Sequence, residues 1–245
     1  MMKGLIAFLL LLGCGCMRVT AAPWIAIEVG EHPHIRWLQD IMYKVVNTVV
    51  TEEVYDALVA VQSRYVRVPM SIIGLEKKKR LVLSVLYLTD DATNEIELAD
   101  KVEAQLKKSS IASSEVFINH EGGWFGKEKD QLVVKIVDST QVLHTLRVAL
   151  TEAIEERFIN NDFPFVPHVC LGQVRTKAII DFVVRLTKIS SDHDEIKTMM
   201  NRINKRLSEV VETIPLHPKM GPTIAVRGID FFGAARVSVR KISLL

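Results

Sequence analysis

The chain has 245 residues, of which 49% are hydrophobic, and its 31 basic and 29 acidic residues give a formal net charge of +2. This length and composition predict a globular protein with a sizeable core and exclude an intrinsically disordered chain. The near-balance of charge predicts no strongly basic surface for non-specific nucleic-acid binding.

Residues 1–22 differ in character from the rest of the chain. Lys3 precedes a short apolar run at 5–12, and small residues follow as far as Ala22. This order is typical of a secretory signal peptide, and the apolar run is well short of the ~20 residues that cross a bilayer. We therefore expect a protein that is secreted or held in the secretory lumen, with no transmembrane helix after cleavage. The alternatives are lipid attachment at Cys14 in a bacterial source, an uncleaved anchor, or a buried first strand.

Cleavage near Ala22 changes the charge and the cysteine content of the mature chain. Two basic residues and no acidic residue leave with the signal, so that the two signs become equal in number. Cys14 and Cys16 also leave, and Cys170 remains as the single cysteine. A disulfide scaffold is thereby excluded, and the mature fold must depend on its apolar core.

Apolar periodicity after the signal predicts strands alternating with helices. In the first half we expect strands at 24–29, 66–73 and 80–88 and helices at 35–49, 52–62 and 96–106. In the second half we expect strands at 115–119, 131–137, 168–174, 223–230 and 236–244, a turn-rich loop at 120–126, and helices at 142–154, 178–186 and 196–214. This order predicts an α+β or α/β protein with two similar halves.

The strand that contains His168 is the most informative segment. Pro167 disfavours a helix before it, and Cys170 lies on the same face of the strand as His168 because side chains alternate. An imidazole in this setting can exchange protons near neutral pH. Taken alone, it is more often a buried core histidine than a catalytic one. A Cys170 nucleophile with His168 as base is a further alternative, although the apolar neighbours favour an inert thiol.

The segments from Glu115 onward resemble the two-histidine (2H) phosphoesterases. They comprise an extended segment, a Gly-Gly-Trp-Phe-Gly loop ending at Gly126, an apolar strand, an amphipathic helix, and the sequence Phe165-Val-Pro-His-Val-Cys-Leu-Gly. The last of these is similar to the Pro-His-x-Thr-Leu strand of that family, which includes bacterial 2',5' RNA ligase-like proteins and the phosphoesterase-like domain of an A-kinase anchoring protein.

The resemblance implies an α+β fold with two lobes, built from antiparallel sheets with flanking helices around a central cleft. The expected lobes are 23–110 and 111–245, and the second lobe contains an additional helical region at 176–220.

The family uses a second histidine strand, which is altered in this chain. The resemblance aligns Arg80 with the missing histidine and Val82 with a threonine or serine. In the family, two histidines act as general base and general acid without a metal, and the hydroxyl groups hold the phosphate oxygens. Arginine cannot accept a proton at pH 7 but binds phosphate well. Loss of one acid/base group typically lowers a rate ~10²–10⁴-fold.

Other polar residues give weaker signals. His32 and His34 have a spacing compatible with a metal site, but without further ligands we expect an exposed loop. His120 lies in the predicted Gly-rich loop, whose glycine spacing fits a turn rather than a nucleotide-binding motif. The basic run at 76–80 is typical of a solvated loop that leads into the altered strand. We expect no metal and no cofactor.

The sequence therefore predicts a 2H phosphoesterase-like protein that binds or weakly hydrolyses an RNA or nucleotide phosphodiester, either 2',5'-linked or cyclic. The candidate catalytic residues are His168 and Cys170, and the candidate substrate-binding positions are Arg80 and Val82. The expected partner is a nucleotide or a short RNA. The alternative is a secreted, non-catalytic interaction module that keeps the fold.

Overall fold

The computed structural model describes residues 22–59, 73–75, 81–125, 131–161, 165–188, 190–191, 193–211, 219 and 221–245. The predicted signal peptide falls almost entirely outside these residues and stays a prediction. Arg80 and the rest of the basic run at 76–80 also lie outside them. Among the helices of the described part, none is both long enough and apolar enough to cross a membrane.

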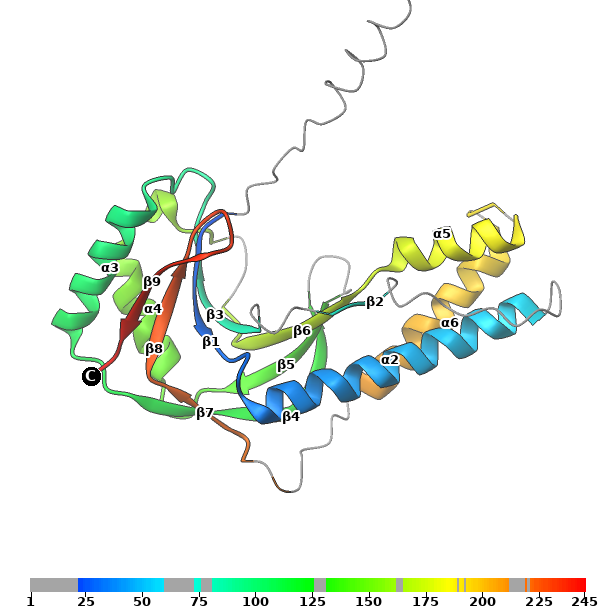
Figure 1. The fold of residues 1–245 in the computed structure, drawn as a ribbon, viewed down its shortest axis with the longest axis horizontal. Coiled ribbons are helices and arrows are strands. Elements are labelled where there is room, and N and C mark those ends of the chain that lie inside the picture. Colours follow the sequence, from blue (N-terminus) through cyan, green and yellow to red (C-terminus); the bar gives the residue numbers. More distant parts are fainter. Residues whose placement is uncertain are drawn as a thin grey trace, which may run out of the picture.

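The fold is α+β, as predicted, and its centre is one antiparallel sheet (Figure 1). The strands lie in the order β7-β4-β5-β6-β3-β1-β8-β9, and the short β2 pairs with β6. Their bounds are β1 Trp24–Glu28, β2 Ile73–Leu75, β3 Val82–Tyr87, β4 Ser114–Phe125, β5 Gln131–Val137, β6 His168–Val174, β7 Thr223–Val226, β8 Gly228–Phe232 and β9 Ser238–Ser243. The helices are α2 Pro33–Val59, α3 Glu95–Ser109, α4 Val142–Ala153, α5 Thr176–Thr187 and α6 Asp194–Val211.

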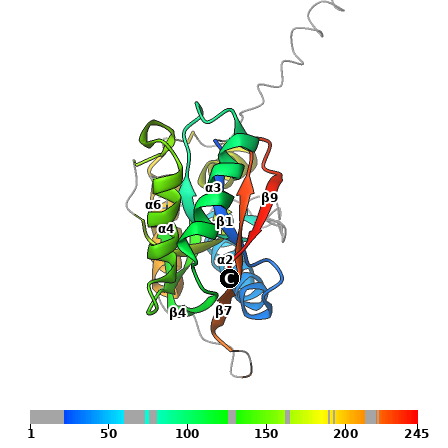
Figure 2. The ribbon, with the colours of Figure 1, turned by 90° about the vertical axis from the view of Figure 1, so that its left-hand side faces the viewer.

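The sheet is bent, and each half carries its own helices on the outside (Figure 1). Helices α3 and α4 lie side by side over the half formed by β3, β1, β8 and β9 (Figure 2). Helices α2 and α6 cover the half formed by β4, β5 and β6. The two halves meet where β3 pairs with β6, through Leu83 and Val169. Both side chains are completely buried on the helix-covered face.

Each half of the sheet takes elements from both sides of the sequence division at residue 110. Helix α2 packs on β6, which comes late in the chain, whereas α4 packs on β3, which comes early. The final strands β8 and β9 extend the half that contains β1. The two halves are therefore interlocked by the path of the chain.

The predicted strand at 223–230 is divided at Arg227 into β7 and β8, which pair with strands in different halves of the sheet. The chain passes directly from one half to the other at this point. A Cβ atom on Gly228 would lie 2.6 Å from the carbonyl oxygen of Ile242, so that only glycine fits this close approach. Apolar residues alternate at Ile224 and Val226 and again at Ile229 and Phe231, but the phase shifts by one residue at the crossing. This shift was the signal that two strands, and not one, occupy the segment.

Two further expectations differ from the structure. The helix expected at 35–49 and the described part of the one expected at 52–62 form one helix, α2, because no proline or glycine interrupts the chain between them. Residues 60–62 lie outside the described residues. The turn-rich loop expected from His120 is largely part of β4, which extends to Phe125. Pairing of β4 with β5 shifts between Ile118 and Gly122, so β4 absorbs the additional residues as an irregularity within the strand.

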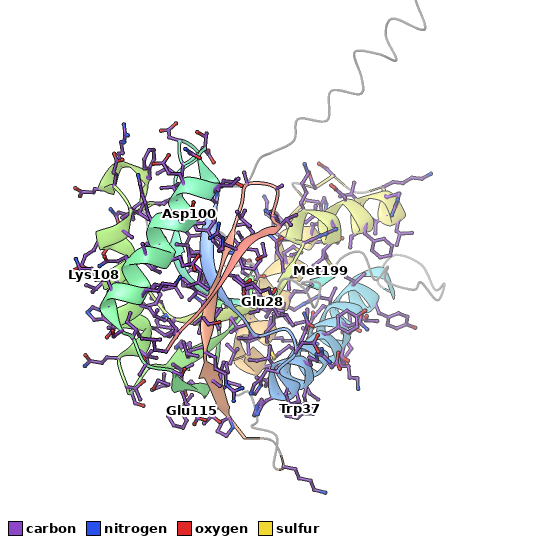
Figure 3. All side chains as sticks on the ribbon, turned by 60° about the vertical axis from the view of Figure 1, so that its left-hand side comes forward. Glu28, Trp37, Asp100, Lys108, Glu115 and Met199 are labelled. Carbon is purple, nitrogen blue, oxygen red and sulfur yellow. The ribbon has the colours of Figure 1, made fainter. Side chains whose placement is uncertain are left out.

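Helices α2, α5 and α6 extend beyond the sheet as a helical arm (Figure 1). The apolar face of α6 is buried, and Met199 lies fully buried among these helices (Figure 3). A buried carboxylate on α2, Glu53, binds Arg202 Nε and Arg206 Nη1 of α6, each at 2.9 Å. Within the helical region predicted at 176–220, α6 therefore packs against the end of α2.

Candidate functional site

His168 and Cys170 lie on the face of the sheet that is not covered by α2, α3, α4 and α6. Because Leu83 pairs with Val169, the neighbouring pairs place Ser84 opposite His168 and Val82 opposite Cys170. Opposite side chains on one face have Cβ atoms ~4.5–5.5 Å apart. The structure thus brings the two strands singled out by the sequence into direct contact.

His168 is half-buried, and its ring is held from two sides. Its Nδ1 lies 2.7 Å from the carbonyl oxygen of Val166, and its ring stacks against Phe125 with centroids 4.2 Å apart. Because a carbonyl oxygen only accepts hydrogen bonds, Nδ1 carries the proton and Nε2 is the acceptor in the neutral ring. Desolvation lowers the pKa of His168, while the hydrogen bond to Val166 acts in the opposite direction. The imidazole is therefore neutral at pH 7, with Nε2 suited to accept a proton.

We call β3 and β6 the motif strands. Each of them contains one extra residue, a β-bulge, directly after the segment in which they pair with each other. In β3, pairing with β1 shifts between Ser84 and Leu86, which leaves Val85 as the bulged residue. In β6, pairing with β5 shifts between Cys170 and Gly172, so Leu171 is the bulged residue there. β-Bulges commonly occur beside active sites, where they redirect side chains.

A long side chain from a helix binds the carbonyl group of each bulged residue. Gln39 Nε2 of α2 donates to the Leu171 oxygen at 2.8 Å, and Arg147 Nη1 of α4 donates to the Val85 oxygen at 2.9 Å. Arg147 also lies over the ring of Phe165, just before β6. Both motif strands thus show the same features in the same order. A paired segment is followed by a bulge, and a side chain from a helix donates a hydrogen bond to the carbonyl oxygen of the bulged residue. The two strands are related by a local two-fold symmetry.

This symmetry relates His168 to Val82 and Cys170 to Ser84. Sequence resemblance aligned the histidine position with Arg80 and the hydroxyl position with Val82, whereas the strand register places them at Val82 and Ser84. The first strand therefore retains a hydroxyl group, and valine stands at its histidine position. The sequence contained a signal for this bulge, because Val85 and Leu86 are both apolar and interrupt the alternation expected of a strand.

The bulge in β3 brings Tyr87 to the same face as Ser84. Nearly half of the Tyr87 side chain is exposed, yet its hydroxyl interacts with Ser84 and lies near the Cys170 thiol. Desolvation of the hydroxyl raises the pKa of Tyr87, and the nearby Cys170 thiol raises it further. The hydrogen bond with Ser84 lowers this pKa. Because the net direction is upward, Tyr87 stays protonated at neutral pH and can donate a hydrogen bond. The Cys170 thiol itself points to the Gly172 oxygen at 3.7 Å.

Lys135 of β5 is a further residue beside His168 that sequence reasoning missed. It pairs directly with His168 across the ladder and is exposed on the same face. A Cβ atom on Gly123 of β4 would touch the Lys135 stem at 3.8 Å, so the lysine extends toward that strand. The available signal was the single charge within the apolar sequence Leu132-Val-Val-Lys-Ile-Val.

The other histidines do not form a metal site in the described part of the chain. His34 is completely buried at the start of α2 and meets Trp37 edge-on, and His32 binds the Thr223 carbonyl oxygen at 2.8 Å. The exposed loop expected for this pair is therefore wrong. The side chain of His120 lies outside the described residues. No group of three or more metal-ligating side chains occurs among the residues that the structure describes.

Comparison with solved structures identifies the fold. Kluyveromyces marxianus Usb1 matches with a TM-score of 0.55 at 13% identity, covering 92% of this chain and 100% of that chain. The same protein with uridine monophosphate gives a TM-score of 0.53 at 12% identity and the same coverage. E. coli LigT complexed with 3'-AMP matches at a lower TM-score of 0.42, with 12% identity and coverage of 91% and 98%.

The fold assignment rests on the two Usb1 structures. The chain has the fold of the 2H phosphoesterases, which confirms the fold that the sequence resemblance implied. No protein-family model matches the sequence, and no curated protein matches it significantly.

Proposed function

We propose that this protein binds a nucleotide or an RNA phosphodiester end at His168 and is impaired as a phosphodiesterase. One observation carries the proposal: His168 faces Ser84 across the β6–β3 junction, while the position related to His168 by symmetry is Val82. The fold shared with Usb1, which is described with uridine monophosphate, supports a nucleotide as the ligand.

The groups at the site suit binding better than cleavage. Cleavage of a phosphodiester by acid/base catalysis needs one group that removes a proton and another that supplies one. Neutral His168 can accept a proton at Nε2, but Val82 cannot donate one. The hydroxyl groups of Ser84 and Tyr87 can donate hydrogen bonds to phosphate oxygens. We therefore expect a ligand to be held, with turnover ~10²–10⁴-fold below that of a site with both groups.

Ligand binding and turnover by purified protein test this proposal. Uridine monophosphate should raise the melting temperature by mass action, and His168→Ala should remove most of that shift. Hydrolysis of uridine 2',3'-cyclic phosphate, followed by chromatography, should be barely above the His168→Ala background. Efficient hydrolysis that depends on His168 would overturn the proposed impairment. Absence of any nucleotide-dependent shift would overturn binding and favour the non-catalytic interaction module.

A further inference from the structure

The open face of the sheet contains an ordered row of polar residues across three strands. Lys135 of β5 pairs with His168 of β6, and His168 lies opposite Ser84 of β3. Adjacent strands are ~4.8 Å apart, so an ammonium group, an imidazole and a hydroxyl group stand side by side. Such a row offers a phosphate group the charge of Lys135 and the hydroxyl donor of Ser84. His168 becomes a donor at Nε2 once the adjacent phosphate charge raises the pKa of the imidazole and it takes up a proton.

An apolar row lies next to this polar row on the same face. Phe117 of β4 pairs with Val137 of β5. The Ile136 amide donates to the Pro167 oxygen at 2.9 Å, which extends the β5–β6 pairing beyond His168. Val166 therefore lies opposite Val137 and continues the row. All three side chains are large, hydrophobic and at least 40% exposed. We call Phe117, Val137 and Val166 the apolar strip.

The two rows have a defined spacing and polarity. Val137 is two residues from Lys135 on β5, which corresponds to ~6.6–6.8 Å along a strand, similar to the separation of base and phosphate in a mononucleotide. Glu115 (labelled in Figure 3) lies two residues before Phe117 on β4 and therefore on the same face, on the side of the strip away from Lys135. A negative charge thus stands at one end and Lys135 at the other. An anionic ligand group is therefore favoured beside Lys135.

Charged groups on the other half of this face are engaged with one another. Lys241 of β9 lies 2.7 Å from Glu28 and 3.6 Å from Asp230, and Ser238 binds Asp230 at 2.9 Å. In the β5–β6 ladder, the cation paired directly with His168 is Lys135. This arrangement directs a phosphate toward β5 and β6.

We propose that a nucleoside monophosphate, or the terminal nucleotide of an RNA, binds with its phosphate on Lys135, His168 and Ser84 and its base on the apolar strip. This inference rests on the proposed function and adds the orientation of the ligand and the residues that select for a nucleotide over phosphate alone. Lys135 supplies charge to the phosphate, and the Phe117 ring supplies a stacking surface for the base.

Calorimetric titration of three probes with matched variants tests the orientation. The probes are uridine monophosphate, uridine and inorganic phosphate. Lys135→Met should weaken binding of uridine monophosphate and phosphate roughly 10–100-fold, because a charge-assisted hydrogen bond is lost, and should leave uridine unchanged. Phe117→Ser should weaken uridine monophosphate and uridine roughly 5–100-fold and leave phosphate unchanged.

Controls separate this inference from the proposed function. Lys44→Met and Ile96→Ser alter exposed residues on α2 and α3 and should change no affinity. Phe117→Leu keeps an apolar side chain without a ring and should show an intermediate loss, which guards against a folding defect in the serine variant. If wild-type protein binds uridine monophosphate and His168→Ala loses it while Lys135→Met and Phe117→Ser bind normally, the orientation is overturned and the proposed function stands. If wild-type protein binds none of the probes, the proposed function itself is overturned.

Discussion

Val82 occupies in β3 the position that His168 occupies in β6. The bulge that follows each residue, at Val85 and at Leu171, fixes this equivalence independently of sequence similarity. In the site that we propose, an aliphatic side chain therefore stands at the position related to His168 by symmetry, and Ser84 adds a hydroxyl group next to it. At the scale of single residues, the proposed impairment depends on Val82 alone.

Val82→His is expected to restore phosphodiesterase activity. The new imidazole would stand at the two-fold-related position to His168, and a general acid or base typically contributes ~10²–10⁴ in rate. We expect a gain of about that size in hydrolysis of uridine 2',3'-cyclic phosphate, measured by chromatography under single-turnover conditions. Val82→Asn, which adds polarity without proton transfer at pH 7, should remain inactive.

Arg80→His provides the competing alignment for the same experiment. It follows the sequence resemblance, whereas Val82→His follows the strand register. Activity that appears in Arg80→His and not in Val82→His would show that the register argument is wrong. Loss of the gained activity in the Val82→His, His168→Ala double variant would tie it to both imidazoles.

The bulges in β3 and β6 are the elements that shape this face. Each one buries a carbonyl group outside the regular ladder, at residues that are only 1% exposed. Gln39 and Arg147 reach these carbonyl groups from helices on the covered face. The bulge in β3 also places Tyr87 beside Ser84. Helices α2 and α4 therefore support the site without touching the face on which it lies.

Gln39→Leu is expected to lower the free energy of unfolding by ~1–3 kcal/mol, the cost of a buried carbonyl that loses its donor. Urea denaturation monitored by circular dichroism measures this difference. Gln105→Leu is the matched control, because Gln105 binds Glu152 on an exposed helix surface and such changes usually stay within ~0.5 kcal/mol. Equal effects of the two substitutions would contradict the role assigned to Gln39.

Individual elements could be predicted from the sequence much better than their connections. The strand at His168 and the helices at 96–106 and 142–154 were expected because local apolar periodicity determines them. The pairing of β6 with β3, and the packing of α2 on β6, depend on contacts between distant parts of the chain. For the same reason Lys135 and Phe125 were missed: each becomes part of the site only through its neighbour across the sheet or across space.

At the scale of the whole molecule, α2 and α6 connect the bent sheet with the end of the helical arm. Helix α2 packs on β6, α6 packs on β4, and the two helices pack on each other. The exposed fraction of the Glu53 side chain is 8%, against 51% for Arg202 and 37% for Arg206. The carboxylate is thus the buried partner of an ionic contact whose arginines reach solvent. The contact holds the arm to the helix that supports the site.

The ion pair of Glu53 makes a specific contribution to the pH dependence of stability. Desolvation raises the pKa of Glu53, but the hydrogen bonds and charges of Arg206 and Arg202 outweigh it and lower the pKa below its usual value of 4.5. A carboxyl group with a depressed pKa in the folded state stabilises the protein above the unfolded pKa, and this stabilisation is lost as pH falls through the folded value. Glu53→Gln should therefore be less stable than wild type at pH 7 by ~1–3 kcal/mol, and the difference should shrink below pH 4.5.

Urea denaturation of both proteins between pH 7 and pH 3 measures this convergence. Glu52→Gln is the matched control, because Glu52 binds Arg206 at 2.6 Å but its side chain is 51% exposed. An exposed ion pair is worth at most ~1 kcal/mol, so the control should differ little from wild type at any pH. A Glu53→Gln difference that persists unchanged to pH 3 would show that the ionised carboxylate is not what holds α2 to α6. In that case the packing of Met199 and the other apolar residues of α6 would account for the position of the arm.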